Sequence, residues 1–200
     1  MSFLFQAKQR IAFLGDERLG NASRNDAVSR ILERIAIRYP RLELFGLNCC
    51  TTGLSLQRAL EQSIPKADWL VLAVGMHDGL RGTGLDEFEF SYRQLLERCG
   101  KCTVVCEPCA LETSEIAQLE PYRAVVEALA LESQLPFSPF QRALNRVLPG
   151  THSSDWGAGF TLNGAGSALV SEEFLGAAGF EVFEDDDEPK SDSTQLEVNI

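Results

Sequence analysis

The sequence predicts an α/β fold: a three-layer α/β/α sandwich with helices on both faces of a five-stranded parallel sheet. Apolar stretches of strand length alternate with stretches whose apolar residues recur at helical spacing. Residues 69–75 are apolar on both faces, as expected for a central strand of a covered parallel sheet. In the stretch 10–15, the residues after Arg10 are also apolar and stop at Gly15-Asp16, which is typical of a buried strand that ends in a sharp turn.

The first half of the chain gives two strand–helix units and the third strand. After strand 10–15, a helix is expected to start at 23–26 and to end before Pro40. Its inward face carries Val28, Ile31, Leu32, Ile35, Ala36 and Tyr39. A second strand is expected over 42–48 and a second helix over about 54–64, with Pro65 as its stop.

The second half continues the alternation. Strand 69–75 leads into a glycine-rich loop at 79–84 and then a helix with an apolar stripe at Phe88, Tyr92, Leu95, Leu96 and Cys99. Strand 103–106 precedes a long helix with Leu119, Tyr122, Val126, Leu129 and Ala130 inward. Two prolines limit the fifth strand, 135–140, to a short edge strand, followed by a short helix at 141–147. Asn163 opens a final helix that ends near 176–179, so the arrangement is flavodoxin-like.

Composition fits one globular domain, which we place at residues 1–183. The chain has 200 residues, of which 44% are hydrophobic and 24% charged. The net charge of -11 argues against a nucleic-acid surface, which needs clustered Lys and Arg. Residues 184–200 hold seven acidic residues and one lysine, so we expect an acidic, disordered tail that solvates the chain end.

The sequence also bears on location and redox state. Residues 1–10 lack a basic region followed by an apolar one, and no apolar run reaches membrane-spanning length. We therefore expect a cytoplasmic protein without a membrane partner. In that compartment the six cysteines are expected to be reduced thiols.

Three blocks carry a resemblance to a known family. They are Gly15-Asp16-Glu17, Gly75-Met76-His77-Asp78, and the segment Leu162-Asn163-Gly164-Ala165-Gly166. Together they resemble the SGNH, or GDSL-type, hydrolases over roughly residues 10–178. The resemblance implies the three-layer fold and a cleft where the ends of these blocks meet.

The family's activity depends on a serine hydroxyl that a histidine activates and an aspartate orients. The resemblance places Glu17 at the serine, Thr161 at the histidine and Ala158 at the aspartate. It places Cys50, through its backbone N–H, and His77 at two oxyanion-binding positions. No triad member remains, which implies a pseudoenzyme whose former cleft binds an unidentified small molecule or protein, or serves as a scaffold, without a cofactor.

Two free-energy terms favour the hypothesis that the protein does not hydrolyse esters. Losing one oxyanion donor costs about 2.7–4 kcal/mol of transition-state stabilisation. An ionised Glu17 about 4 Å from a developing oxyanion would oppose it by about 4 kcal/mol at an effective dielectric near 20. The alternative hypothesis is a small ester or acyl hydrolase that uses a non-standard site with His77 and Glu17.

Other constellations are open at this stage. The cleft candidates are Asp16, Glu17, Cys50, His77, Asp78, Thr161 and Asn163. Four of them, Asp16, Glu17, His77 and Asp78, offer oxygen and nitrogen ligands for a divalent metal. We favour instead that Asp16 and Asp78 bind turn backbones, while Glu17 and His77 face solvent or each other. The motif at 152–155 (His-Ser-Ser-Asp) pairs a histidine with an aspartate, and we interpret it as a polar surface loop.

The cysteines allow two interpretations. Cys99 and Cys102, like Cys106 and Cys109, form a Cys-x-x-Cys pair, a spacing used by zinc and iron–sulfur sites. The pairs leave different predicted elements, so buried structural thiols are favoured and no metal is expected. The adjacent Cys49 and Cys50 are compatible with a redox pair or a pocket rim.

Overall fold

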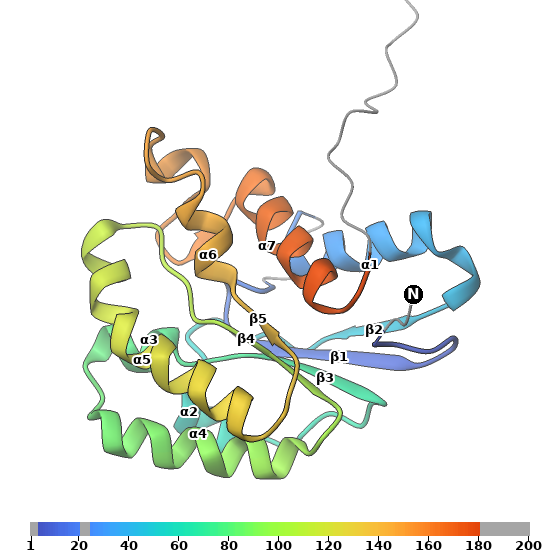
Figure 1. The fold of residues 1–200 in the computed structure, drawn as a ribbon, viewed down its shortest axis with the longest axis horizontal. Coiled ribbons are helices and arrows are strands. Elements are labelled where there is room, and N and C mark those ends of the chain that lie inside the picture. The colour runs from blue at the N-terminus through green and yellow to red at the C-terminus, as the bar shows by residue number, and fades with distance from the viewer. Residues whose placement is uncertain (1–3, 21–24, 181–200) are drawn as a thin grey trace, which may run out of the picture.

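A five-stranded parallel sheet forms the centre of the molecule in the computed structural model, which describes residues 4–20 and 25–180 (Figure 1). The strands are β1 (Arg10–Gly15), β2 (Phe45–Asn48), β3 (Trp69–Ala73), β4 (Thr103–Cys106) and β5 (Phe137–Ser138). Their order is β2-β1-β3-β4-β5, and every pair is parallel. The predicted fold class is confirmed, with β3 at the centre and β5 at an edge.

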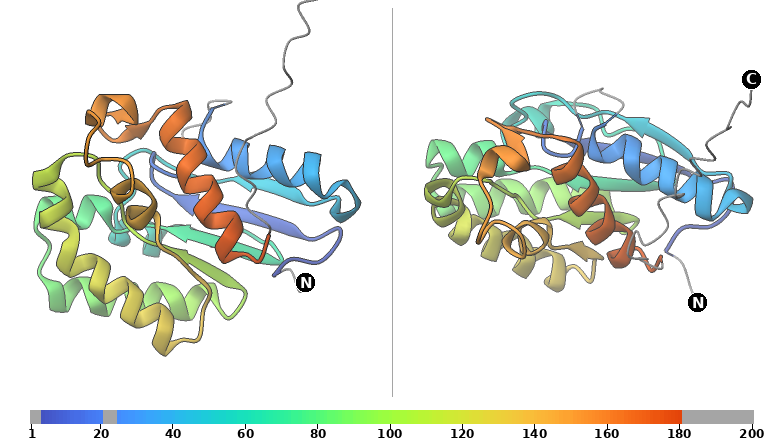
Figure 2. Two further views of the ribbon diagram at one scale, coloured as in Figure 1. Left: turned by 45° about the horizontal axis from the view of Figure 1, so that its top comes forward. Right: turned by 90° about the horizontal axis from the view of Figure 1, so that it is seen from above.

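Helices cover both faces of the sheet. One face carries α1 (Ala27–Arg38), α6 (Phe140–Asn145) and α7 (Gly164–Ala177). The other carries α2 (Leu56–Glu61), α4 (Leu85–Cys99) and α5 (Thr113–Glu132). The two views of Figure 2 show α1 and α7 next to each other above the same strands. Short α3 (Met76–Arg81) follows β3 at the carboxyl edge of the sheet.

Side-chain alternation along the strands divides the core into two clusters. Ile11 and Phe13 of β1 pack with Val71 of β3 beneath α1 and α7. Leu14 and Leu72 point the other way and pack with α2, α4 and α5. A strand with buried residues on both faces reads as continuously apolar, which is why β1 and β3 were recognisable in the sequence.

Several predicted boundaries are wrong. Strand 42–48 begins only at Phe45, because Pro40–Leu42 form a 3-10 turn (η1) and Glu43 has a left-handed φ of 47°. The helix predicted at 54–64 spans Leu56–Glu61, with Ser55 as its N-cap. The strand predicted at 135–140 is reduced to Phe137–Ser138, and the short helix begins at Phe140.

The glycine-rich loop predicted at 79–84 is wrong for its first half. Residues 79–81 belong to α3, which starts after Gly75 at a φ of 109° and ends before Gly82 at a φ of 74°. The residue at position 79 is a glycine because α5 passes close to it and leaves no room for a side chain. A Cβ at Gly79 would lie 2.5 Å from Leu119 and 3.0 Å from Tyr122.

A small hairpin near the end of the described chain was not predicted. Strands β6 (Gly157–Ala158) and β7 (Thr161–Leu162) pair antiparallel, after a 3-10 turn, η2, at Ser153–Asp155. Two-residue strands carry no alternation for a sequence pattern to detect. The final helix was predicted correctly, since Asn163 caps α7 by accepting from the N–H groups of Ala165 and Gly166.

Two predictions fall outside the described residues. These are the start of the first helix at 23–24 and the acidic tail at 184–200. None of the helices in residues 4–20 and 25–180 combines the length and apolarity needed to cross a membrane.

Candidate functional site

The turn after β1 is fixed by backbone contacts. The N–H of Asp16 donates to the carbonyl of Ala73 in β3 (3.2 Å), and Asp16 Oδ1 accepts from the N–H of Arg18 (2.9 Å). Gly15 has no room for a side chain, because a Cβ there would lie 2.7 Å from the Ala73 carbonyl oxygen. Asp16 therefore holds the turn backbone, as expected, and the turn presents Glu17 to the interior.

Glu17 and His77 face each other rather than solvent. His77 Nε2 lies 3.1 Å from Glu17 Oε1 and 3.2 Å from Oε2. Both residues are buried, with 5% and 7% of their surface exposed. The N–H of Gly53 also donates to Glu17 Oε2 at 2.8 Å. The Glu17 carboxylate thus joins three segments: the turn after β1, the loop after β2, and α3.

These contacts set the charge state of Glu17. Burial raises the pKa of its carboxyl, but the N–H groups of Gly53 and of Glu17 itself, with the His77 ring, oppose that effect. The net result holds the pKa of Glu17 below its ordinary value. Glu17 is therefore an ionised carboxylate at neutral pH, surrounded by hydrogen-bond donors.

The neighbouring Asp16 has the opposite character. Burial raises the pKa of the Asp16 carboxyl to about 7, although the Arg18 N–H and the nearby His77 lower it. The site thus holds two adjacent acidic residues whose surroundings shift their pKa values in opposite directions.

Asp78 joins α3 to α2. Its two carboxylate oxygens accept from the N–H of Leu56 at 3.2 and 3.0 Å, at the first residue of α2. Burial raises the pKa of Asp78, and the Leu56 hydrogen bond counteracts this. Asp78 therefore binds backbone, as the sequence predicted, and serves the structure rather than the cleft.

Arg18 is a site residue that sequence reasoning missed. It is only 3% exposed, and its Nη2 donates to the carbonyl of Gly159 at 2.9 Å. Its Nε lies 3.4 Å from Met76 Sδ, and Nη2 lies 3.9 Å from a carboxylate oxygen of Glu115. Arg18 thereby ties the β6–β7 hairpin to the turn that carries Glu17. In the sequence, the only indication that Arg18 belongs to the site is its position directly after Asp16 and Glu17.

The β6–β7 hairpin covers the site with an aromatic ring. Phe160, in the turn of the hairpin, meets the His77 ring edge-on at a centroid distance of 5.1 Å. Ala158 and Thr161 are register partners in the hairpin, and their side chains carry neither an imidazole nor a carboxylate. The hairpin brings Gly159 and Phe160 to the site.

The side-chain amide of Asn163 forms its hydrogen bonds with backbone groups. Besides accepting from two N–H groups of α7, its amide nitrogen donates to the Asp155 carbonyl at 2.8 Å. Both ends of the Asn163 amide therefore serve the backbone, the oxygen as a helix cap and the nitrogen as a tie to the preceding loop.

Cys50 does not supply the backbone donor predicted for it. Its N–H donates to Asn48 Oδ1 at 3.0 Å, and its thiol lies 3.7 Å from the Phe13 carbonyl. Burial raises the pKa of the Cys50 thiol far above its ordinary value. The N–H that reaches the site belongs to Gly53, three residues later, whose φ of 69° suits a glycine.

The Cys-x-x-Cys pairs are divided between interior and surface. Cys106 and Cys109 are buried, Cys99 is half-buried and Cys102 is exposed. Burial of all four was therefore wrong for Cys102, which follows the end of α4. Burial raises the pKa of the Cys99 and Cys109 thiols to about 12. Among the described residues, no three His, Cys, Asp or Glu side chains are placed to hold a metal ion.

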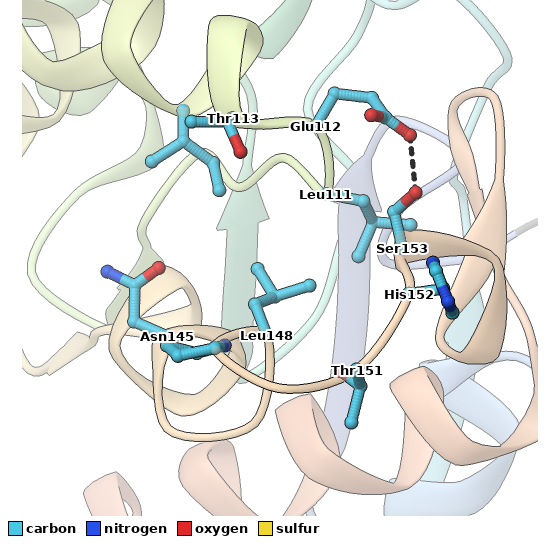
Figure 3. A pocket seen from close by; sticks show the side chains of 10 residues that line it. Leu111, Glu112, Thr113, Asn145, Leu148, Thr151, His152 and Ser153 are labelled. Atoms are coloured by element: carbon cyan, nitrogen blue, oxygen red, sulfur yellow. Dashed lines mark hydrogen bonds between the residues drawn. The ribbon is translucent and has the colours of Figure 1, made fainter.

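A pocket of about 450 Å³ opens where the chain leaves β4 and α6 (Figure 3). Glu112 and Thr113 lie on one side of it, and Asn145, Leu148 and Thr151 on the other. Ser153 Oγ donates to Glu112 Oε1 at 2.5 Å across one end. The pocket thus combines hydroxyl, amide and carboxylate groups with apolar walls.

The His-Ser-Ser-Asp motif contributes to the rim of this pocket. His152 is exposed, and its backbone N–H donates to Asp155 Oδ2 at 3.0 Å. The aspartate therefore closes the η2 turn. The interpretation of this motif as a polar surface loop agrees with that geometry.

The fold is shared with solved hydrolase structures. LAE5, an alpha/beta hydrolase enzyme from the metagenome of Lake Arreo in Spain, matches with a TM-score of 0.79 at 18% identity, covering 89% of this chain and 98% of that one. Axe2, an acetylxylan esterase from Geobacillus stearothermophilus, matches with a TM-score of 0.79 at 20% identity, covering 90% and 99%. No family model matches the chain, and no curated protein does. The chain therefore has the fold of α/β hydrolases that include an esterase.

Proposed function

We propose that this chain is a non-catalytic protein of the SGNH-hydrolase type, and that its role is to bind a small polar molecule. The observation that carries the non-catalytic part of the proposal is the buried hydrogen bonding of Glu17 to His77 and Gly53. By resemblance, Glu17 occupies the position of the serine nucleophile. A carboxylate there accepts hydrogen bonds but offers no hydroxyl for a base to activate.

The surroundings of Glu17 oppose ester hydrolysis in two further ways. Its negative charge would act against a developing oxyanion by about 4 kcal/mol at 4 Å and an effective dielectric near 20. The N–H of Gly53 and the ring of His77 already donate to the carboxylate, so they are not available to a substrate oxygen. Hydrolysis would therefore require breaking a buried, satisfied cluster.

The other triad positions support the same conclusion. Among the matching structures are catalytic mutants of Axe2 that lack a serine, an aspartate or a histidine, the last two being three positions apart. Ala158 and Thr161 have the same separation in this chain. Neither can orient or carry a proton as an aspartate–histidine pair does.

A binding role is supported by the pocket of Figure 3. Its volume of about 450 Å³ lies within the usual range for small-molecule sites, roughly 300–1,000 Å³. It opens beyond the carboxyl ends of the strands, where open α/β sheets bind their ligands. The buried cluster of Glu17 and His77 would then be a structural element, and the neighbouring pocket would bind the ligand.

A thermal-shift screen tests the binding role. The probes are a panel of monosaccharides, free amino acids and nucleosides, and at least one class is expected to raise the Tm. Thr113→Trp, which fills the pocket, should abolish that shift, whereas Ser114→Trp, one residue outside it, should retain it. A panel without any shift, or a shift that survives Thr113→Trp, contradicts the proposal.

Restoring the triad tests the catalytic part. The variant Glu17→Ser, Ala158→Asp, Thr161→His is expected to gain hydrolysis of p-nitrophenyl acetate over the unaltered chain. The reason is that it removes the opposing charge and returns a hydroxyl, an imidazole and a carboxylate together. A folded but inert triple variant would show that the lost groups are not what prevents catalysis.

One observation favours a second candidate function. Because Glu17 orients His77 through Nε2, the pair has the geometry of a carboxylate–histidine base that activates water for ester hydrolysis. Comparing p-nitrophenyl ester turnover by the unaltered chain and by His77→Ala separates the candidates. Turnover that His77→Ala abolishes would establish the second candidate and refute the first.

A further inference from the structure

Strand β2 is an edge strand that the described residues leave uncovered. It pairs with β1 on one side and, within residues 4–20 and 25–180, with no strand on the other. Phe45 and Leu47 are 58% and 42% exposed, unusually high for large apolar side chains of a sheet. Leu47 is the register partner of Ala12, whose side chain faces α2 and α4. Phe45 and Leu47 therefore form an apolar stripe on that same face, at its uncovered margin.

The outer edge of β2 also presents backbone groups. The N–H of Phe45 donates to the Gln9 carbonyl (3.0 Å), and that of Cys49 to the Phe13 carbonyl (2.8 Å). Alternation along a strand then directs the N–H and C=O groups of Gly46 and Asn48 outward. Open edges of this kind are templates for a further strand, and natural sheets usually cover them.

The described part of the chain ends at Phe180, close to the segment that leads into β2. The ring of Phe180 lies 5.0 Å, centroid to centroid, from that of Tyr39, which directly precedes η1, the turn that leads into β2. Fifteen residues, 181–195, separate this point from the segment 196–200. When extended they reach about 50 Å, at roughly 3.3 Å per residue, which is ample to bring the segment alongside β2.

Segment 196–200 has the sequence pattern of a half-buried strand. Leu196, Val198 and Ile200 alternate with the polar Glu197 and Asn199. Placed beside β2, the three apolar side chains would share one face of the added strand, next to the exposed apolar stripe. Its polar residues would then face the opposite side.

Opposite charges on the residues after Phe180 and on the residues near β2 also favour binding of the segment to this edge. The acidic run 184–188 follows Phe180 by only three residues. Lys8, Arg10 and Arg41 are exposed near the start of β2, where the Lys8 N–H donates to the Leu42 carbonyl and Arg10 is the register partner of Phe45. Glu43, 4.0 Å from Lys8, and Asp68, which accepts from the Arg10 N–H at 2.6 Å, reduce this positive charge without cancelling it.

We propose that residues 196–200 of this chain, in contrast to the disorder expected for the acidic tail as a whole, pair with the outer edge of β2 as a sixth strand of the sheet. The added strand covers Phe45 and Leu47 and binds the outward backbone groups of Gly46 and Asn48. Because β2 leads into the loop that delivers the Gly53 N–H to Glu17, the added strand also restrains one side of the candidate site.

Amide hydrogen exchange measured by NMR on the full chain tests the proposal. The amides of Gly46 and Asn48 should be protected, and Val198→Asp, on the apolar face of the segment, should speed their exchange roughly tenfold or more. Asn199→Asp adds the same charge on the opposite face and should leave both rates unchanged. Neither residue lies in the described fold, so both variants are expected to fold normally.

Two results would overturn the proposal. Equal exchange of the Gly46 and Asn48 amides in all three proteins would mean that the segment does not bind the edge. Protection that disappears on dilution, together with a dimer in sedimentation, would assign the edge to a second copy of the chain instead.

Discussion

Replacing Glu17 by alanine should lower the stability of the fold markedly. Glu17 is only 5% exposed and its carboxylate accepts from the Gly53 N–H and the His77 ring, so the alanine variant leaves two buried donors without an acceptor. Each such group costs about 1–3 kcal/mol. We therefore expect the free energy of unfolding to fall by about 3 kcal/mol. Glu17→Gln keeps an acceptor for Gly53 and should cost about 1 kcal/mol.

Urea unfolding at several pH values measures this effect. Because the pKa of Glu17 is lower in the folded protein than in the unfolded chain, its contribution is present above the unfolded value of 4.5. The contribution disappears as the pH falls through the folded pKa. The difference in stability between the unaltered chain and Glu17→Gln should accordingly be largest near pH 7 and shrink in acid.

A matched control separates this effect from general helix or surface changes. Glu33 is exposed on α1, and Glu33→Ala should change stability by less than about 0.5 kcal/mol. A Glu17→Ala variant as stable as Glu33→Ala would refute the reasoning. So would a gap between the unaltered chain and Glu17→Gln that widens as the pH falls.

Three further predictions concern groups around the site. Burial holds the pKa of Asp16 at about 7 in the folded protein, so the stability it contributes is full below pH 4 and is lost as the pH rises through 7. Asp16→Asn should thus gain stability relative to the unaltered chain between pH 5 and pH 8 in urea unfolding. Asn163→Ala removes the cap of α7 and should cost about 1 kcal/mol in the same assay. Gly79→Ala drives a Cβ against Leu119 and Tyr122 and should lower the Tm, at a cost of about 1–3 kcal/mol.

Each of these has a contradicting result. A pH-independent effect of Asp16→Asn would mean that the carboxyl keeps an ordinary pKa. If Asn163→Ala left the stability unchanged, the Asn163 amide would not act as a stabilising helix cap and would again be a candidate cleft residue. An unchanged Tm for Gly79→Ala would show that α3 and α5 are further apart than the structure has them.

The fold was predictable because burial on both faces leaves a continuous apolar signature. Residues 69–75 were recognised as a central strand from that signature alone, and Asn163 was recognised as a helix start from its residue type. Errors arose where tertiary contacts decide the local structure. Gly79 is a glycine because α5 passes against it, whereas the sequence pattern around it suggested a loop.

The site was predictable to the extent that it lies next to strand ends. Glu17, His77 and Asp78 directly follow predicted strands, so their convergence follows from parallel topology. Their partners were not predictable in the same way. Gly53 reaches Glu17 from a loop 36 residues away, and Arg18 reaches Gly159 from 141 residues away. Such pairings depend on how loops and hairpins fold back, which no local pattern encodes.

We propose that none of the hydroxyls in residues 4–20 and 25–180 is activated as a nucleophile. The most direct measurement is the intact mass of the purified protein after exposure to a fluorophosphonate, which attaches covalently to hydroxyls activated by a neighbouring base. We expect no adduct on the unaltered chain and one adduct, at residue 17, on the variant Glu17→Ser, Ala158→Asp, Thr161→His. A stoichiometric adduct on a serine or threonine of the unaltered chain would contradict the proposal.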